Sequence, residues 1–150
     1  MKTIRLIWVG KSKDPFVLGG IEKYLKLLKP YADIETVEVK EARGTDSRMA
    51  RQEEGARILE KARAYILLDE SGEEMTSLEF AGFLREMIED RVPRDLVVGG
   101  PFGVSEAVRK GAVKQVALSR LTFTHQMVRL VLMEQIFRAF TILKGRPYHY

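Results

Sequence analysis

The chain has 150 residues, of which 45% are apolar and 31% charged, a composition typical of one folded domain over residues 1–150 and not of a disordered protein. The absence of cysteine excludes disulfides, thiolate catalysis and cysteine-ligated metal centres, and we expect no metal. The apolar run at residues 6–9 is too short for a signal peptide or a membrane span, so we expect a cytoplasmic protein with no membrane partner.

Charge is distributed unevenly along the chain, although the net charge is only +4. Residues 101–150 carry eight basic against two acidic side chains, a net charge of +6, whereas residues 51–100 have a net charge of −5. The same basic third contains both histidines, His125 and His149. Because imidazole titrates near neutral pH, this region is where we expect chemistry on a polyanion.

Segments typical of strands alternate with segments typical of helices along the whole chain. Ile34–Val39 alternates apolar and polar residues, which predicts a strand with one exposed face near a sheet edge. Thr76 and Glu79 have the spacing of a capping box. In chain order we expect a strand at Thr3–Val9, a helix at Phe16–Leu28, a strand at Ile34–Val39, a helix capped by Ser47 and ending near Arg63, a strand at Tyr65–Asp69, a helix from Thr76 to about Glu89, a strand at Leu96–Val98, a short helix from Ser105, a strand at Gln115–Leu118 and a long helix at Thr124–Lys144.

Continuously apolar central strands separated by helices indicate an α/β fold, with a mostly parallel sheet covered by helices on both faces. In sheets of this kind, ligands bind beyond the carboxyl ends of the strands. The loops that follow Leu68, Val98 and Leu118 are therefore the candidate ligand-binding loops.

The loop after Val98 is rich in glycine, with Gly99, Gly100 and Gly103 close together. Its backbone can approach a ligand closely and offer N–H groups. No Lys-Ser/Thr pair follows Gly103, which excludes a P-loop, and the glycine spacing does not fit the dinucleotide-binding fingerprint. Taken alone, the pattern favours a tight turn that needs positive φ.

The loop at residues 118–123 contains leucine and phenylalanine where a solvated turn would be polar. It can wrap a flat, partly apolar ligand such as an adenine, with backbone groups reading the edge of the base. The alternative is that Leu121 and Phe123 only anchor the final helix to the core.

The final helix carries apolar side chains around most of its circumference, which predicts burial in the core and an interface between two copies of the chain. Glu134 and Arg138 have the spacing of a helical salt bridge. Tyr148 and His149 lie at the chain end, where side chains ordinarily fray.

An ordered set of short motifs resembles one family over the whole chain. The motifs are Gly99-Gly100-Pro101-Phe102-Gly103, the run from Leu118 to Arg129, Glu134-Gln135-Ile136-Phe137-Arg138-Ala139 and Pro147-Tyr148-His149. They resemble the ribosomal RNA large subunit methyltransferase H family, the pseudouridine N3-methyltransferases of 23S rRNA in the SPOUT superfamily. The resemblance implies an α/β fold with a C-terminal trefoil knot, and a homodimer whose active site takes residues from both subunits. Physical principles alone would not predict a knot, because knotted chains are rare.

The resemblance also implies that the three candidate loops hold S-adenosyl-L-methionine. Matching the motifs places the cofactor contacts at Leu68, Gly99, Gly100, Leu118, Ser119, Arg120, Leu121, Thr122 and Phe123. The implied substrate is N3 of a pseudouridine in 23S rRNA on the assembled ribosome. A chain with no appended RNA-binding domain would use the shape of the ribosome and a basic dimer surface to find it.

Three residues near the C-terminus are the catalytic candidates that the resemblance implies. His149 would assist removal of the N3 proton, since a neutral imidazole can accept one. Arg138 would favour the N3 anion or hold an oxygen or phosphate, and Tyr148 would stack on the base or hydrogen-bond to it. Many members of the family have a basic residue after this Tyr-His pair, whereas this chain ends at Tyr150, which weakens the case for a phosphate contact from the extreme tail.

Two other functions fit parts of the sequence. One is a non-catalytic ribosome-binding or assembly factor of the same fold, which would have no need of an intact glycine loop. The other is a phosphate-handling α/β enzyme, which the missing P-loop lysine disfavours.

Overall fold

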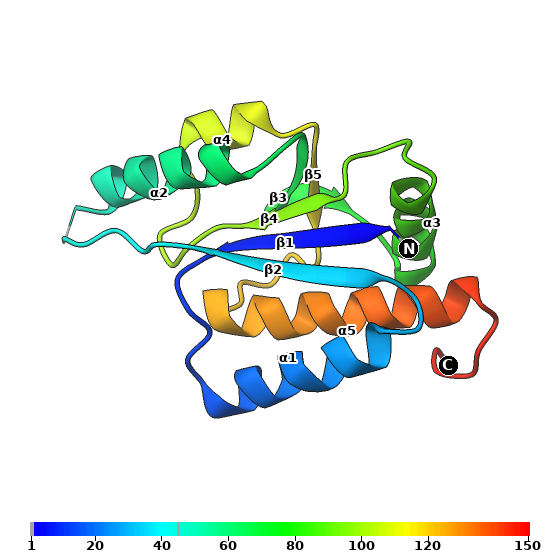
Figure 1. The fold of residues 1–150 in the computed structure, drawn as a ribbon. Coiled ribbons are helices and arrows are strands. Elements are labelled where there is room, and N and C mark those ends of the chain that lie inside the picture. Colours follow the sequence, from blue (N-terminus) through cyan, green and yellow to red (C-terminus); the bar gives the residue numbers. More distant parts are fainter. Residues whose placement is uncertain (1, 45) are drawn as a thin grey trace.

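The computed structural model describes residues 2–44 and 46–150, which form one five-stranded sheet with helices on both faces (Figure 1). The strands are β1 (Thr3–Val9), β2 (Asp33–Val39), β3 (Tyr65–Glu74), β4 (Asp95–Val98) and β5 (Lys114–Ala117). The helices are α1 (Pro15–Leu28), α2 (Ser47–Lys61), α3 (Ser77–Ile88), α4 (Glu106–Gly111) and α5 (His125–Leu143). The strand order is β2-β1-β4-β3-β5 and every pair is parallel, so the predicted α/β fold is confirmed.

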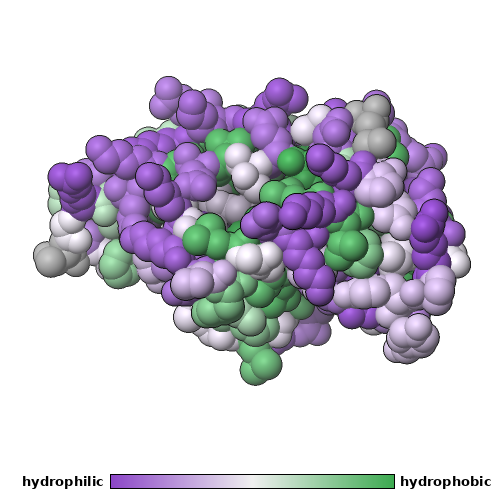
Figure 2. All heavy atoms as spheres, turned by 60° about the horizontal axis from the view of Figure 1, so that its bottom comes forward, coloured by the Kyte–Doolittle hydropathy of each residue, from purple (hydrophilic) through white to green (hydrophobic). Residues whose placement is uncertain are grey.

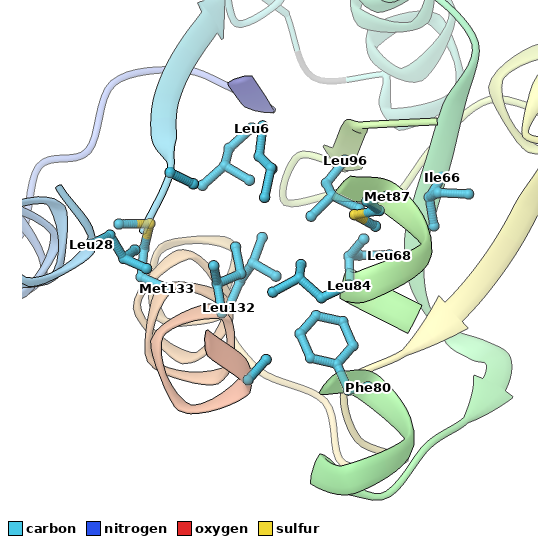
Figure 3. Packing of buried hydrophobic residues seen from close by; sticks show 14 of the residues in the cluster. Leu6, Leu28, Ile66, Leu68, Phe80, Leu84, Met87, Leu96, Leu132 and Met133 are labelled. Atoms are coloured by element: carbon cyan, nitrogen blue, oxygen red, sulfur yellow. The ribbon is translucent and has the colours of Figure 1, made fainter. Parts of the chain in front are cut away.

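The core is divided by the sheet into two layers. Helices α1, α3 and α5 cover one face, and α2 and α4 cover the other (Figure 1). On the first face, strand residues pack against residues from all three helices, as Figure 3 shows for Leu6, Ile66, Leu68, Leu96, Leu28, Phe80, Leu84, Met87, Leu132 and Met133. Complete burial of each such side chain stabilises the fold by about 1.5–3 kcal/mol, so this layer holds α5 firmly against the sheet.

Most helices start at the residues that the sequence predicts. Thr76 caps α3 in a complete capping box, as predicted, and the side chains of Ser105 and Thr124 cap α4 and α5 at the predicted helix starts. Helix α2 is capped by Asp46 and not by Ser47, because the Asp46 carboxylate accepts hydrogen bonds from two backbone N–H groups of the first turn. Strand β2 lies at the sheet edge, as its alternating pattern predicts.

Strand β3 differs from the prediction, which ends it at Asp69, because it continues to Glu74. Its pairing with β5 is interrupted after Leu68 and resumes at Glu73, so the intervening residues form a bulge. Gly72 makes this close return possible, since a Cβ there would lie 2.7 Å from the backbone of β5. The turn-like residues therefore mark a bulge within the strand.

The carboxyl ends of all five parallel strands lie on the same side of the sheet, and α5 starts on that side. The helix then runs back along the sheet, so that the C-terminus lies near the side on which the strands begin (Figure 1). Among the described residues, no helix is long and apolar enough to cross a membrane. The C-terminal trefoil knot stays a prediction.

Candidate active site

A pocket of about 470 Å³ opens at the bulge of β3 and where β4 and β5 end. The three predicted loops form its walls, and the first turn of α5 closes it with Thr124, His125 and Val128. Eight of the nine predicted cofactor contacts line the pocket: Leu68, Gly99, Gly100, Leu118, Ser119, Leu121, Thr122 and Phe123. The structure thus brings these loops together, while their role in cofactor binding stays a prediction.

The remaining predicted contact, Arg120, is not among the residues that line the pocket. Its guanidinium donates to the carbonyl of Glu70 at 2.9 Å and forms an ion pair with Glu74. The hydroxyl of Thr122 donates to the Glu70 carboxylate at 2.6 Å. Arg120 therefore fastens the loop at residues 118–123 to β3.

The glycine loop is a tight turn in which backbone conformation requires one glycine and close packing requires the other two. Gly103 has φ of +83°, a region that favours glycine. A Cβ on Gly99 would lie 2.7 Å from Val104, and one on Gly100 would lie 2.9 Å from Glu54 Oε1. The turn interpretation holds for Gly103, and close packing explains the other two.

The loop at residues 118–123 does not anchor α5 through Leu121, because 72% of that side chain is exposed. Phe123 is half-buried, and both residues line the pocket. An exposed leucine at the mouth of a polar-rimmed pocket offers an apolar surface to a flat ligand.

Asp69 is a pocket residue that the sequence reasoning passed over, although it directly follows Leu68. Burial raises its pKa, but hydrogen bonds from Arg109 at 3.0 Å and from Ser71 outweigh burial and hold the pKa below its usual value. Asp69 is therefore an ionised carboxylate at neutral pH, and Arg109 fixes its position on the wall of the pocket.

Arg129, on the second turn of α5, is completely buried next to the turn that lines the pocket. Its guanidinium donates to the carbonyl of Val9 at 2.5 Å, and to the carbonyl of Gly10 and the hydroxyl of Ser12 at 3.0 Å each. It also lies 5.0 Å from the centre of the Trp8 ring. Burial lowers its pKa to about 10, so it remains a cation at neutral pH and ties the start of α5 to the end of β1.

Glu54 is a second buried group beside the pocket, with 2% of its surface exposed. Its Oε2 accepts from the Ala42 N–H at 3.0 Å, while its Oε1 lies behind Gly100 without a hydrogen-bond partner among the described residues. Burial raises the pKa of this carboxyl, because an unpartnered carboxylate loses its hydration.

We expect Glu54→Gln to gain stability relative to the original chain as the pH rises. The raised folded-state pKa means that ionisation destabilises the fold once the pH exceeds the ordinary carboxyl value of 4.5. Urea unfolding of both proteins at pH 4.5 and pH 7.5 tests this. A stability difference that does not change between the two pH values would show that Glu54 is not destabilised by ionisation.

The C-terminal tail folds back onto α5 and is not frayed. Arg138 pairs with Glu134, as the helical spacing predicts, and its Nη1 lies 3.1 Å from Nδ1 of His149. The Tyr148 hydroxyl donates to Glu134 Oε1 at 3.1 Å, and its ring packs edge-on against Phe137 with the centroids 4.8 Å apart. The three predicted catalytic residues therefore form one contiguous group, which we call the tail cluster: Glu134, Arg138, Tyr148 and His149.

Burial and hydrogen bonding in the tail cluster determine which groups donate protons in hydrogen bonds and which accept them. The hydrogen bond to Glu134 raises the pKa of Arg138, so its charge is permanent. Burial raises the pKa of Tyr148, which keeps its hydroxyl neutral and able to donate. Since a guanidinium can only donate, Nδ1 of His149 is the acceptor, and a neutral ring then carries its proton on Nε2.

The tail cluster and the pocket lie at opposite ends of α5. The pocket is lined by His125, whereas the tail cluster is centred on Arg138. Thirteen residues of α-helix at 1.5 Å per residue separate them by roughly 20 Å. A substrate atom in the pocket is therefore out of reach of His149 of the same chain.

Comparison with known proteins gives one consistent family. Residues 1–149 match the family model described as a predicted SPOUT methyltransferase. The chain is 43% identical over 152 residues to the ribosomal RNA large subunit methyltransferase H of Geobacter sp. (strain M21), covering 98% of each chain. It is 42% identical over 151 residues to the protein of the same name from Thermodesulfovibrio yellowstonii, covering 100% of each chain.

Among solved structures, a TrmH-family protein from Porphyromonas gingivalis aligns with a TM-score of 0.42 and 10% identity, over 90% of this chain and 59% of that chain. That likeness is weak, and the family assignment depends on the sequence matches. This chain belongs to the SPOUT methyltransferase family and, within it, to the ribosomal RNA large subunit methyltransferase H proteins.

Proposed function

We propose that this SPOUT methyltransferase, acting as one domain over residues 1–150, transfers the methyl group of S-adenosyl-L-methionine to N3 of a pseudouridine in 23S rRNA on the assembled ribosome. The observation that carries the proposal is the pocket at the β3 bulge and the carboxyl ends of β4 and β5, in a chain whose relatives are named ribosomal RNA large subunit methyltransferases. Such a function places the protein in the cytoplasm, where ribosomes are.

The residues of the pocket fit this cofactor. Gly99 and Gly100 line the pocket together with Leu118, Leu121 and Phe123, which supply apolar surface. A volume of about 470 Å³ lies within the usual range for small-molecule sites. When bound, the cofactor supplies a methyl group already activated by its positive sulfonium. The protein must then align the target and remove its N3 proton.

We assign proton removal to His149, with Arg138 as its partner. In the tail cluster the lone pair of His149 Nδ1 is occupied by the Arg138 guanidinium. When the target base arrives, Arg138 turns to the negative charge that develops on the base and frees Nδ1 to accept the proton. Tyr148, whose ring lies 4.9 Å from the Arg138 guanidinium, stacks against the base or donates to it.

A homodimer would bring the two halves of the site together. One chain holds the pocket and the tail cluster at opposite ends of α5, so a second copy packed on α1 and α5 would place its tail beside the pocket. Apolar side chains are exposed on this side of the molecule (Figure 2), including Phe16 at 62% and Leu18 at 47% on α1. Burying them between two copies would remove them from water.

Transfer of labelled methyl groups tests the proposal most directly. Ribosomes from a strain that lacks the activity should accept the label from this protein, and mapping should place it on N3 of one pseudouridine of 23S rRNA. Calorimetry with S-adenosyl-L-methionine, S-adenosylhomocysteine and ATP separates the alternatives. Ribosome binding without cofactor binding would indicate an assembly factor, and binding of ATP alone would indicate a phosphate-handling enzyme.

A further inference from the structure

A second groove, of about 550 Å³, opens beside the cofactor pocket where β1 and β2 end. Four exposed basic residues line it, Lys11, Lys13, Lys40 and Arg43, and we call it the basic groove. These residues come from the first third of the chain and not from the basic C-terminal third that the sequence emphasises.

The cations of the basic groove are available to a ligand. Among the described residues, none of the four forms an ion pair, whereas Lys2, Lys114 and Arg120 are each paired with a carboxylate. The groove also contains two acidic residues, which leaves it a net charge of +2; they are Glu38 and Glu41. An anion entering the groove would meet positive charge without displacing a salt-bridge partner.

One wall of the basic groove is held by the first turn of α5. The Gln126 side chain accepts from the Lys13 N–H at 2.9 Å and donates to the Lys11 carbonyl at 3.0 Å. The preceding residue, His125, lines the cofactor pocket. The pocket and the groove are therefore neighbours on the two sides of a single helical turn.

The other wall of the basic groove is held by α2. Arg57 donates to the Lys40 carbonyl at 2.8 Å, and Glu54 accepts from the Ala42 N–H at 3.0 Å. Both walls thus have fixed backbones, while the four long cationic side chains extend into solvent. A fixed backbone with mobile charged ends suits a polyanion whose phosphates vary in position.

We propose that the basic groove binds the ribose-phosphate backbone of the RNA next to the target nucleotide. This rests on the proposed function, because a base whose N3 reaches the pocket carries its neighbouring nucleotides past the first turn of α5. Their phosphates then lie near Lys11, Lys13, Lys40 and Arg43. Such contacts fix the RNA in place without reading its sequence.

Salt dependence of binding tests the proposal with two matched triple variants. One variant carries Lys13→Gln, Lys40→Gln and Arg43→Gln. The control carries Lys61→Gln, Arg85→Gln and Lys110→Gln, which removes the same charge from exposed positions at the ends of α2, α3 and α4 that form no ion pair within residues 2–44 and 46–150. Binding constants are measured across a series of KCl concentrations, for unmethylated large ribosomal subunits and for protein-free 23S rRNA at low salt.

We expect the groove variant to reduce the slope of log K against log salt by about 2 for both RNA probes, since each lost phosphate contact removes about 0.7. The control variant should keep the original slope, and both should bind S-adenosyl-L-methionine normally. An equal reduction of the slope in the two variants would overturn the proposal, because net charge alone would then explain RNA binding. A reduced slope with ribosomal subunits but not with protein-free rRNA would also overturn the proposal, because the groove would then contact a ribosomal protein.

The same measurements separate the groove from the proposed function. If the unmodified protein transfers no methyl group but the groove variant still lowers the salt slope, the proposed function fails and the RNA groove stands. If methyl transfer occurs and the slope is unchanged in the groove variant, the groove proposal fails and the function stands.

Discussion

An equal mixture of two inactive variants should regain about a quarter of the original methyl-transfer activity, if each site takes its pocket from one chain and its tail from the other. Gly99→Val should distort the glycine loop that lines the pocket, because a Cβ at this position already lies 2.7 Å from Val104. Arg138→Ala should disable the tail cluster, because it removes the guanidinium that contacts His149. Each variant alone should be inactive.

The expected fraction follows from how the two chains combine. In a statistical mixture half of the dimers contain one chain of each kind, and each mixed dimer has one intact site, formed by the pocket of the Arg138→Ala chain and the tail of the Gly99→Val chain. Labelled methyl transfer measures this fraction in the mixture, and mixed dimers isolated through two affinity tags should have about half of the original activity per dimer. Gly82→Ala is the matched control for adding a side chain at a glycine, because a Cβ at Gly82 meets nothing within 4 Å.

The opposite result would be equally clear. Mixed dimers that form and bind ribosomes but transfer no methyl group would show that each chain uses its own tail and pocket. The roughly 20 Å separation along α5 would then have to close by movement within one chain.

Replacing Arg129 by methionine should destabilise the protein by about 2–3 kcal/mol. The change leaves the buried carbonyl of Val9 and the partly buried acceptors of Gly10 and Ser12 without their donor, and each fully buried unpaired group costs about 1–3 kcal/mol. Burial of the cation itself is unfavourable, as its lowered pKa shows, so the net loss is smaller than the sum.

Urea unfolding measures this loss, and calorimetry should show weaker cofactor binding, because Arg129 fixes the turn that carries His125 and Val128. Arg48→Met is the matched control at an exposed position on α2 and should change stability by less than about 0.5 kcal/mol. An Arg129→Met protein as stable as the control would mean that these hydrogen bonds contribute little net stability.

Short-range signals in the sequence were sufficient for most of the fold. The alternation in Ile34–Val39 predicted the edge strand β2, and Thr76 with Glu79 predicted the start of α3, because pleat and capping depend on residues a few positions apart. The β3 bulge was missed, since Gly72 is explained only by the backbone of β5, about forty residues away.

Buried polar groups were the main omission at the site. Arg129 precedes Leu132, Met133 and Ile136 by three, four and seven positions, so it stands on the core-facing side of α5. That spacing could have identified it as a buried cation. Nothing local could have identified Glu54, whose environment is made by Ala42 and by Gly100 from a distant loop.

By itself, the sequence determined the kind of protein and the components of the site: a parallel α/β sheet, three loops beyond Leu68, Val98 and Leu118, and Arg138 on the final helix with His149 in the tail. Only the tertiary structure decided how these components lie in space. It gathers the loops into one pocket, places the tail cluster at the far end of α5, and builds the basic groove from residues 11–43. The physical reason is that strand and helix signals are local, whereas burial, ion pairing and the distance between two ends of a helix depend on how the elements pack.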